Sequence, residues 1–294
     1  MSIVKSFSVG EGDMFYIKHG SDSFTIIDCC ISDDNRDDLI KEIKSESKNK
    51  GITRFISTHP DDDHFRGLAD LNKNMPICNF YCVKNEATKP DETDDFDTYC
   101  ILRDDSNKAF FLSRGCSRKW LNMDDNERGS AGINILWPIT SNEHYIEALK
   151  KAKEGKSFNN ISSIVRYSLN GGTTVLWMGD LETDFMENIK DEITMDIADI
   201  LFAPHHGRDS GKVPKNWLDD MNPKLVIIGE APSKDLNYYD GYDTITQNSA
   251  GDITLECVSG ETHIYVSNQN YSVDFLDNEY LPETYGKYIG TLKA

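Results

Sequence analysis

Short runs of apolar residues, many with β-branched or aromatic side chains, recur along the chain between clusters of Gly, Asp, Asn and Ser. Such runs predict strands rather than long helices. The turn at 10–13 joins the first two runs and indicates a hairpin. We expect strands at 7–9, 14–17, 24–28, 52–57, 133–137, 163–169, 173–178, 200–202, 224–229, 253–257 and 263–266.

Between these strands, apolar residues three and four positions apart predict amphipathic helices. One begins after the capping residues at 32–34, buries Leu39, Ile40 and Ile43, and ends at Gly51. Further helices are expected at 143–153, 183–193 and 214–221. Two similar halves, each with strands followed by helices, indicate a layered sandwich of two sheets with outer helices.

Residues 84–130 differ because Asp, Asn, Lys and Arg dominate there. We expect an irregular, surface-facing excursion within a single domain that spans residues 1–294. A solvated loop is the preferred interpretation of its basic residues, and a basic rim facing the substrate is the alternative. These residues are Arg103, Lys108, Arg114, Arg118 and Lys119.

The charge balance limits the classes of function. Lys and Arg total 31 and Asp and Glu total 50, which gives a net charge of −19. Coating of nucleic acid without sequence preference needs a net basic surface, so the acidity argues against that role. An enzyme with a local basic groove remains open, and an acidic chain suits a site that concentrates divalent cations.

Neither a membrane span nor a secretory signal is expected. The sequence has no apolar run of about 18 residues, and residues 1–7 lack the apolar region of a signal peptide. The seven cysteines are odd in number and form no C-x-x-C pair, which argues against a disulfide framework. We therefore expect a cytoplasmic protein whose thiols are mainly buried core residues.

The strongest chemical signal is the run His-Pro-Asp-Asp-Asp-His at 59–64, directly after an apolar strand. A turn there lets His59 and Asp61 point to one position and Asp63 and His64 to an adjacent one. Two cations about 3.5–4 Å apart need such a shared cluster. A helix N-cap would account for one Asp, but not for two histidines that flank three carboxylates.

Two weaker signals follow later strands. Trp-Met-Gly-Asp at 177–180 ends in Asp180, which could bridge two metals, although strand-Gly-Asp is also an ordinary turn. Ala-Pro-His-His-Gly at 203–207 carries two adjacent histidines in a chain with only seven. Either His205 or His206 could be a ligand, with the other a proton donor or a phosphate contact.

At these residues the chain resembles the metallo-β-lactamase superfamily. Asp61 stands where the second His of the H-x-H-x-D-H motif usually stands, a variant similar to the soluble hydrolase domain of the DNA-uptake competence protein ComEC and its stand-alone relatives. Val-Gly-Glu-Gly-Asp at 9–13, Ile-Ile-Asp at 26–28 and Asn-Asn-Ile-Ser-Ser-Ile-Val at 159–165 resemble further motifs of that group. The resemblance runs from residue 3 to about residue 266.

The resemblance implies a mixed α/β (α+β) fold, the four-layer αββα metallo-β-lactamase sandwich, with a two-metal site at one sheet edge. Asp13 and Asp28 would hold the ligand loop, and Asn160 would lie near the site and contact substrate. Two departures stand out: Arg208 follows His-His-Gly in place of Ser, and 236–242 lacks the family's later histidines, so that Tyr239 or Asp240 would have to substitute. The implied metal ligands are His59, Asp61, Asp63, His64, Asp180 and His205.

Three carboxylates and three imidazoles favour Mn²⁺, then Zn²⁺, with Mg²⁺ possible. We expect a metal-dependent hydrolase, a nuclease or phosphodiesterase that cleaves DNA or RNA with a hydroxide activated by two metals. Asp63 would orient the hydroxide, His206 would protonate the leaving oxygen, and Arg208 would contact a phosphate. The alternatives are a hydrolase of a small phosphoester, nucleotide or lactone, and a subunit active only with a protein partner in a multi-gene system. A third alternative is a non-enzymatic subunit of a larger assembly, with a structural or vestigial metal site.

Overall fold

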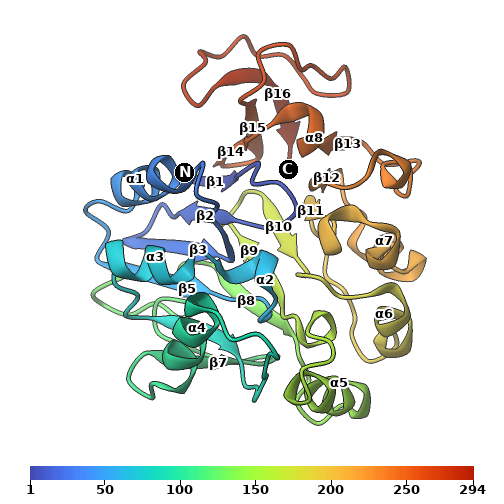
Figure 1. The fold of residues 1–294 in the computed structure, drawn as a ribbon. Coiled ribbons are helices and arrows are strands. Elements are labelled where there is room, and N and C mark those ends of the chain that lie inside the picture. Colours follow the sequence, from blue (N-terminus) through green and yellow to red (C-terminus); the bar gives the residue numbers. More distant parts are fainter.

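Two mixed β-sheets face each other, and helices cover their outer faces (Figure 1). This computed structural model describes the backbone of residues 1–294 and every side chain except that of Ser233. The expected four-layer αββα sandwich is confirmed.

The first sheet is antiparallel on the side of the C-terminal strands and parallel on the other side. Parallel pairing begins where β3 meets β5, so that both strands end at the same edge. Its strands, in spatial order, are β16 (Lys287–Lys293), β15 (Glu261–Val266), β14 (Ile253–Val258), β1 (Ser2–Ser6), β2 (Phe15–Lys18), β3 (Ser23–Ile27), β5 (Ile52–Ile56), β6 (Phe80–Val83) and β7 (Ala109–Leu112).

The second sheet has the same mixed character. β8, β9 and β10 are antiparallel neighbours, whereas β10, β11, β12 and β13 run parallel. In spatial order its strands are β13 (Thr244–Thr246), β12 (Leu225–Ile228), β11 (Ile200–Phe202), β10 (Thr174–Trp177), β9 (Ile164–Ser168) and β8 (Ile133–Trp137). The short strand β4 (Cys29–Cys30) bridges to Phe65 and Arg66 outside the two sheets.

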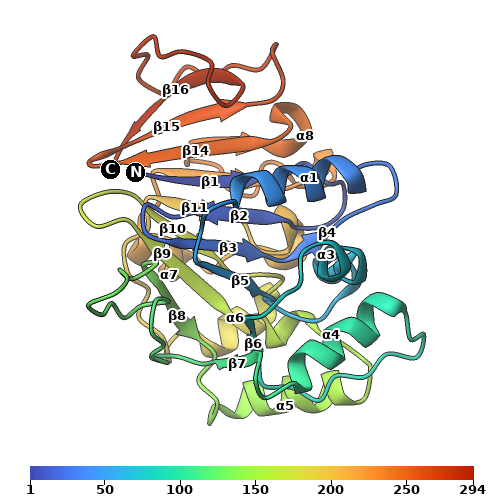
Figure 2. The ribbon, with the colours of Figure 1, turned by 90° about the vertical axis from the view of Figure 1, so that its left-hand side faces the viewer.

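Helices α1, α3 and α4 lie over the first sheet, in front of its strands in Figure 2, and α5, α6 and α7 lie over the second. Thr93 and Asn142 cap α4 and α5 by accepting hydrogen bonds from backbone N–H groups of their first turns. The helices are α1 (Arg36–Glu46), α2 (Asp62–Phe65), α3 (Leu68–Asn74), α4 (Asp94–Asp104), α5 (Glu143–Lys153), α6 (Thr183–Ile189), α7 (Lys215–Met221) and α8 (Gln247–Ala250), with short 3-10 turns at Asn159–Ile161, His205–Gly207, Asp209–Gly211 and Ser233–Asp235.

Buried apolar side chains form three clusters, which correspond to the three interfaces of a four-layer sandwich. One lies between the sheets and includes Phe15, Val165 and Trp177. The other two pack the outer helices on the sheets; Leu39 of α1 belongs to one and Trp217 of α7 to the other. No helix in the described part of the chain combines the length and apolar character needed to cross a bilayer.

Two expectations need correction. The first strand is 2–6 rather than 7–9, because Ile3 and Val4 pair with both β2 and β14, while the chain turns away after Phe7. Residues 84–130 are not irregular throughout. They contain α4, whose Phe96, Tyr99 and Leu102 are buried, and β7, which extends the first sheet. Charged residues on the outer face of α4 hid its apolar side from the sequence pattern.

The topology brings four strand ends to one edge of the sandwich. Asp28 follows β3, the 57–64 segment follows β5, Asp180 follows β10, and His205 follows β11. Each of these strands is parallel to a partner, and the carboxyl ends of parallel strands meet at the same edge.

Candidate metal centre

The 59–64 run folds as a tight turn followed by the short helix α2. Asp61 is the N-cap of that helix, and its side chain accepts a hydrogen bond from the backbone N–H of Asp62. The helix buries His64 completely and leaves the side chain of Asp63 about a quarter exposed. The turn therefore directs His64 into the molecule, toward the ends of β3 and β10.

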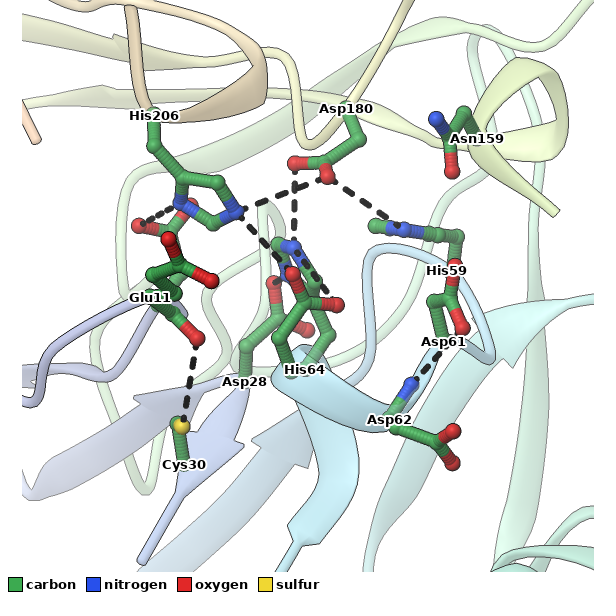
Figure 3. A network of polar contacts seen from close by, with 12 residues as sticks. Glu11, Asp28, Cys30, His59, Asp61, Asp62, His64, Asn159, Asp180 and His206 are labelled. Carbon is green, nitrogen blue, oxygen red and sulfur yellow. Dashed lines mark hydrogen bonds and ion pairs between the residues drawn. The ribbon is translucent and has the colours of Figure 1, made fainter. Parts of the chain in front are cut away.

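His64 lies between two carboxylates from different sheets (Figure 3). Its Nδ1 donates to Asp28 Oδ2 at 2.8 Å, and its Nε2 is 3.0 Å from Asp180 Oδ1 without forming an aligned hydrogen bond. Asp28 also accepts from the backbone N–H and the hydroxyl of Thr58 at 2.8 and 2.6 Å. Asp28 thus fixes the orientation of the His64 ring and leaves Nε2 directed at Asp180.

His206 has the same arrangement on the other side. Its Nδ1 is 3.1 Å from Asp13 Oδ1, and its Nε2 is 3.3 Å from Asp63 Oδ2 and 3.5 Å from Asp180 Oδ2. One possible ligand atom from each of Asp13, His64, Asp180 and His206 falls in a group that spans no more than 4.8 Å. A carboxylate that holds one ring nitrogen while the other faces a common point is the usual support of a metal-binding histidine.

His59 reaches Asp180 from the opposite side to His206, as Figure 3 shows. Its ring is fully buried, and its Nδ1 is 3.1 Å from Thr58 Oγ1. Because the Thr58 hydroxyl gives its own proton to Asp28, its oxygen must accept from His59 Nδ1. Neutral His59 therefore carries a lone pair on Nε2, which is 4.0 Å from Asp180 Oδ2 and has no hydrogen-bond partner among the described residues.

Carboxylates dominate the electrostatics of this centre. Burial alone would lower the pKa of His206, but Asp180 and Asp13 outweigh it and raise that pKa to about 10. Burial would also lower the pKa of His64, but Asp180 and Asp28 outweigh it and raise that pKa well above its usual range. For His59, burial and the neighbouring charge of His64 prevail and lower the pKa to about 4. The centre favours positive charge between Asp180, His64 and His206.

These observations fit a divalent cation. Buried Nε2 atoms of His59 and His64 and the buried Oδ1 of Asp180 have no hydrogen-bond partners in the described part of the chain. Unpaired buried polar atoms are costly unless something satisfies them. Imidazole nitrogens and carboxylate oxygens together are a donor set for Mn²⁺ or Zn²⁺, so Asp63, His64, Asp180 and His206 could hold one ion.

Three of the seven non-glycine residues with positive φ lie at the same place. Asp28, His205 and His206 adopt positive φ angles of 54°, 53° and 57°, which non-glycine residues rarely do. Gly179 has φ 52°, and a Cβ there would lie 2.7 Å from Ser162 Oγ, which accepts from the Asp180 N–H. Such strain persists only where the surrounding structure enforces it, and it clusters at functional sites.

Several residues expected at the site lie at its margin instead. Asp61 pairs with Lys89 Nζ at 2.9 Å. His205 is partly exposed, with Nε2 3.7 Å from Asp180 Oδ2 and Nδ1 2.9 Å from Ser210 Oγ. The amide of Asn160 is paired with Glu182 through both its nitrogen and its oxygen. Their roles as ligands and substrate contact stay predictions.

Arg208 is partly exposed and approaches Glu11 only at 3.7 Å. Tyr239 is buried in the core beneath the outer helices of the second sheet, and Asp240 is exposed. Nothing in the described contacts links either of the last two to Asp180, so the substitution for the missing histidines stays a prediction.

Sequence patterns did not identify three residues that shape the centre. Thr58 fixes the protonated nitrogen of His59, Glu182 holds Asn160, and Lys89 neutralises Asp61. Thr58 and Glu182 adjoin recognisable motifs, so their neighbourhood was a usable signal. Lys89 had none, because it comes from a separate segment between β6 and α4.

Comparisons with known proteins add little. No protein-family model and no curated protein sequence matches the chain significantly. The solved structure of Igni18, a novel metallo hydrolase from the hyperthermophilic archaeon Ignicoccus hospitalis, is similar with a TM-score of 0.48 and 13% sequence identity, over 86% of this chain and 99% of that chain. At that level the likeness carries no argument about activity, which has to come from the residues themselves.

Proposed function

We propose that the protein is a metal-dependent phosphodiesterase that cleaves DNA or RNA. The observation that carries this proposal is the buried group at the strand ends, in which the Nε2 atoms of His64 and His206 face Asp180 while carboxylates hold their Nδ1 atoms. When bound there, divalent cations supply Lewis-acid charge and make water a stronger acid near neutral pH.

His64, Asp180 and His206 would hold one ion, because their ligand atoms converge and all three side chains are buried. Asp63 would complete this set, since its two oxygens lie 3.9 Å from His64 Nε2 and 3.3 Å from His206 Nε2, while Asp13 holds His206 Nδ1. His59 Nε2 faces Asp180 from the other side, which supports the second position that the sequence resemblance implies. Mn²⁺ suits this mixture of carboxylates and imidazoles, with Zn²⁺ next and Mg²⁺ third.

The contacts favour an exchange of the roles expected for the two adjacent histidines. His206 is enclosed by Asp13, Asp63 and Asp180, as a ligand would be. His205 has a 14% exposed side chain and a hydroxyl partner, Ser210. His205 would therefore carry the proton to the leaving oxygen, since it alone of the two reaches solvent.

Arg208, next to this pair, would bind a phosphate. Its side chain is 28% exposed and the carboxylate of Glu11 is 3.7 Å from Nη2, so that its terminal nitrogens are free to bind an anion, while its Nε is buried without a partner among the residues described. The basic residues of 103–119 are less available to bind a phosphate, because Arg103 pairs with Asp104 and Lys119 pairs with Asp125. A short stretch of backbone phosphates near Arg208 is therefore a better fit than a long basic groove.

A small phosphoester or nucleotide is the second candidate substrate. A cavity of about 300 Å³ is lined by Glu182, which follows Asp180 by two residues in the chain, and by Asn160, His144 and Lys151. This volume is at the lower end of the range for small-molecule sites. The net charge of −19 also favours a small ligand over a polymer.

The test is cleavage of end-labelled single- and double-stranded DNA and RNA, and of small phosphodiesters, with Mn²⁺ added. Asp63→Ala and His206→Ala should abolish cleavage and metal retention, whereas His205→Ala should retain the ion and lose about 10²–10⁴-fold in rate. Polymer cleavage should weaken steeply with salt, and small-substrate turnover much less.

Cleavage by Asp63→Ala at the wild-type rate would refute the proposal. Metal-loaded protein that leaves nucleic acid intact but hydrolyses a small phosphodiester would establish the second candidate. Retention of metal by His206→Ala but not by His205→Ala would restore the original assignment of the two histidines.

A further inference from the structure

Lys89 is an unusually confined cation at the edge of the candidate centre. Its side chain is 8% exposed, and its Nζ is 2.9 Å from both Asp61 Oδ1 and Asp62 Oδ1. The ammonium also lies 5.1 Å from the ring of Phe65 and 4.9 Å from that of Phe158. Two carboxylates and two aromatic faces therefore fix one position for this charge.

The backbone that carries Lys89 is also held. Thr88, the preceding residue, donates its N–H to Ala152 O at 3.2 Å and its hydroxyl to Lys153 O at 2.8 Å. Both acceptors belong to the last turn of α5. Lys89 is thus presented to Asp61 by a segment that is anchored on the second half of the molecule, rather than by a freely moving loop.

This pairing changes what Asp61 can offer an ion. Asp61 Oδ1 accepts from both Lys89 Nζ and the backbone N–H of Asp62. Part of the negative charge of Asp61 is therefore already balanced by a fixed ammonium, which Asp61 shares with Asp62. On the side of Asp180 that faces Asp61, the remaining buried atom able to ligate a metal is His59 Nε2, which is 4.0 Å from Asp180 Oδ2.

On the other side of Asp180, no lysine or arginine is paired with the carboxylates among the described ion pairs. Among the described ion pairs, Asp63 contacts only histidines, and so does Asp180. The two positions on either side of Asp180 are therefore unequal in charge, although the sequence motif suggests an equivalent pair.

We propose that Lys89 makes the centre asymmetric: one divalent ion binds tightly at Asp63, His64, Asp180 and His206, and the ammonium of Lys89 weakens the second position beside His59 by taking up the charge of Asp61. This inference rests on the metal centre of the proposed function and adds to it a residue that sets ion stoichiometry. Substitution of Lys89 should convert the weak position into a tight one.

The test is calorimetric titration of the purified, metal-stripped full chain with Mn²⁺ alone, together with metal content measured after gel filtration. Wild type should retain one ion per chain and bind a second weakly. Lys89→Met keeps the apolar stem against Phe65 and Phe158 and should tighten the second ion by about tenfold or more, because a unit charge beside Asp61 is removed.

Three further variants isolate the cause. Lys89→Arg, which keeps the charge, should behave like wild type. The double variant Lys89→Met with Asp61→Asn should lose the gain, because the released carboxylate is absent. Lys150→Met removes an exposed lysine that pairs with Glu147 and should change neither ion. Circular dichroism and the melting temperature show which variants are folded.

Two equally tight ions in wild type would overturn the inference and leave the proposed function intact. An unchanged second affinity in folded Lys89→Met, or the same gain in the double variant, would also overturn it. One tight ion with the predicted Lys89 effect, but no phosphodiester cleavage, would support the inference and refute the proposed function. Failure of wild type to bind any ion would refute both.

Discussion

Thr58 shows how one hydroxyl group determines the state of a neighbouring ring. It donates to Asp28 Oδ2 and lies 3.1 Å from His59 Nδ1, so that its oxygen accepts the proton of the ring. The same carboxylate orients His64. Thr58 thus orients His59 directly and His64 through Asp28, and both effects are transmitted by hydrogen bonds.

Replacement of Thr58 by Val, which has a similar shape, should lower Mn²⁺ affinity by roughly 10–100-fold, the usual cost of removing a partner that orients a ligand. It should also lower the free energy of unfolding by about 1–3 kcal/mol, because buried Asp28 loses a donor. Titration calorimetry and urea unfolding measure the two effects. Thr58→Ser keeps the hydroxyl, and equal losses in both variants would show that packing rather than hydrogen bonding is responsible.

At the scale of elements, Asp199 ties together the starts of three parallel strands. Its carboxylate accepts from the N–H and hydroxyl of Thr174 at 2.9 Å each, and it forms an ion pair with Lys224 at 2.9 Å. Its carbonyl accepts from Lys224 and Leu225. Asp199, the residue before β11, therefore joins β11 to β10 and β12, and β10 and β11 lead to Asp180 and His205 at the opposite edge.

This arrangement predicts a pH-dependent contribution to stability. Burial would raise the pKa of Asp199, but hydrogen bonds from Thr174 and Lys224 outweigh it and lower that pKa. A carboxyl group with a depressed folded-state pKa stabilises the fold above its unfolded pKa of about 3.9, and that stabilisation is lost as the pH falls through the folded value.

Asp199→Asn should therefore lower the free energy of unfolding at pH 7 by about 1–2 kcal/mol, and the difference from wild type should shrink as the pH falls below about 4. Urea unfolding at several pH values measures it. Asp196→Asn, at a nearby exposed position, should match wild type throughout. A difference for Asp199→Asn that is constant with pH would contradict the charge argument.

The sequence predicted the elements with a clear apolar period and missed those that depend on distant partners. The 133–137 strand and 143–153 helix match β8 and α5. By contrast, β16 and β7 are edge strands whose pairing partners, β15 and β6, supply the reason for their conformation. At the centre, motifs located Asp63, His64 and Asp180, but only the folded chain shows that Lys89 reaches Asp61.

At the scale of the whole molecule, the centre joins the two sheets. Asp63 and His64 follow strands of the first sheet, whereas Asp180 and His206 follow strands of the second. Four carboxylates from both sheets, including Asp13 and Asp28, approach His64 and His206. A cation held between them would link the layers as well as serve the chemistry.

Metal binding should therefore raise global stability. At a free Mn²⁺ concentration one hundred times the dissociation constant, the folded state should gain about 2.7 kcal/mol, and a chelator should reverse the gain. Differential scanning calorimetry with and without Mn²⁺ measures the shift in melting temperature. His206→Ala should show little shift, and an equal shift in that variant would mean that the stabilising ion binds elsewhere.

The spacing of the proposed ligands along the chain has a consequence for synthesis. His59, Asp63 and His64 leave the ribosome early, but Asp180 and His206 follow more than a hundred residues later. A nascent chain can therefore present only half of the coordination set for much of its translation. Ion capture should come late, after β11 has joined the second sheet, so that a chain truncated before residue 206 should emerge with its early histidines and carboxylates unable to retain Mn²⁺.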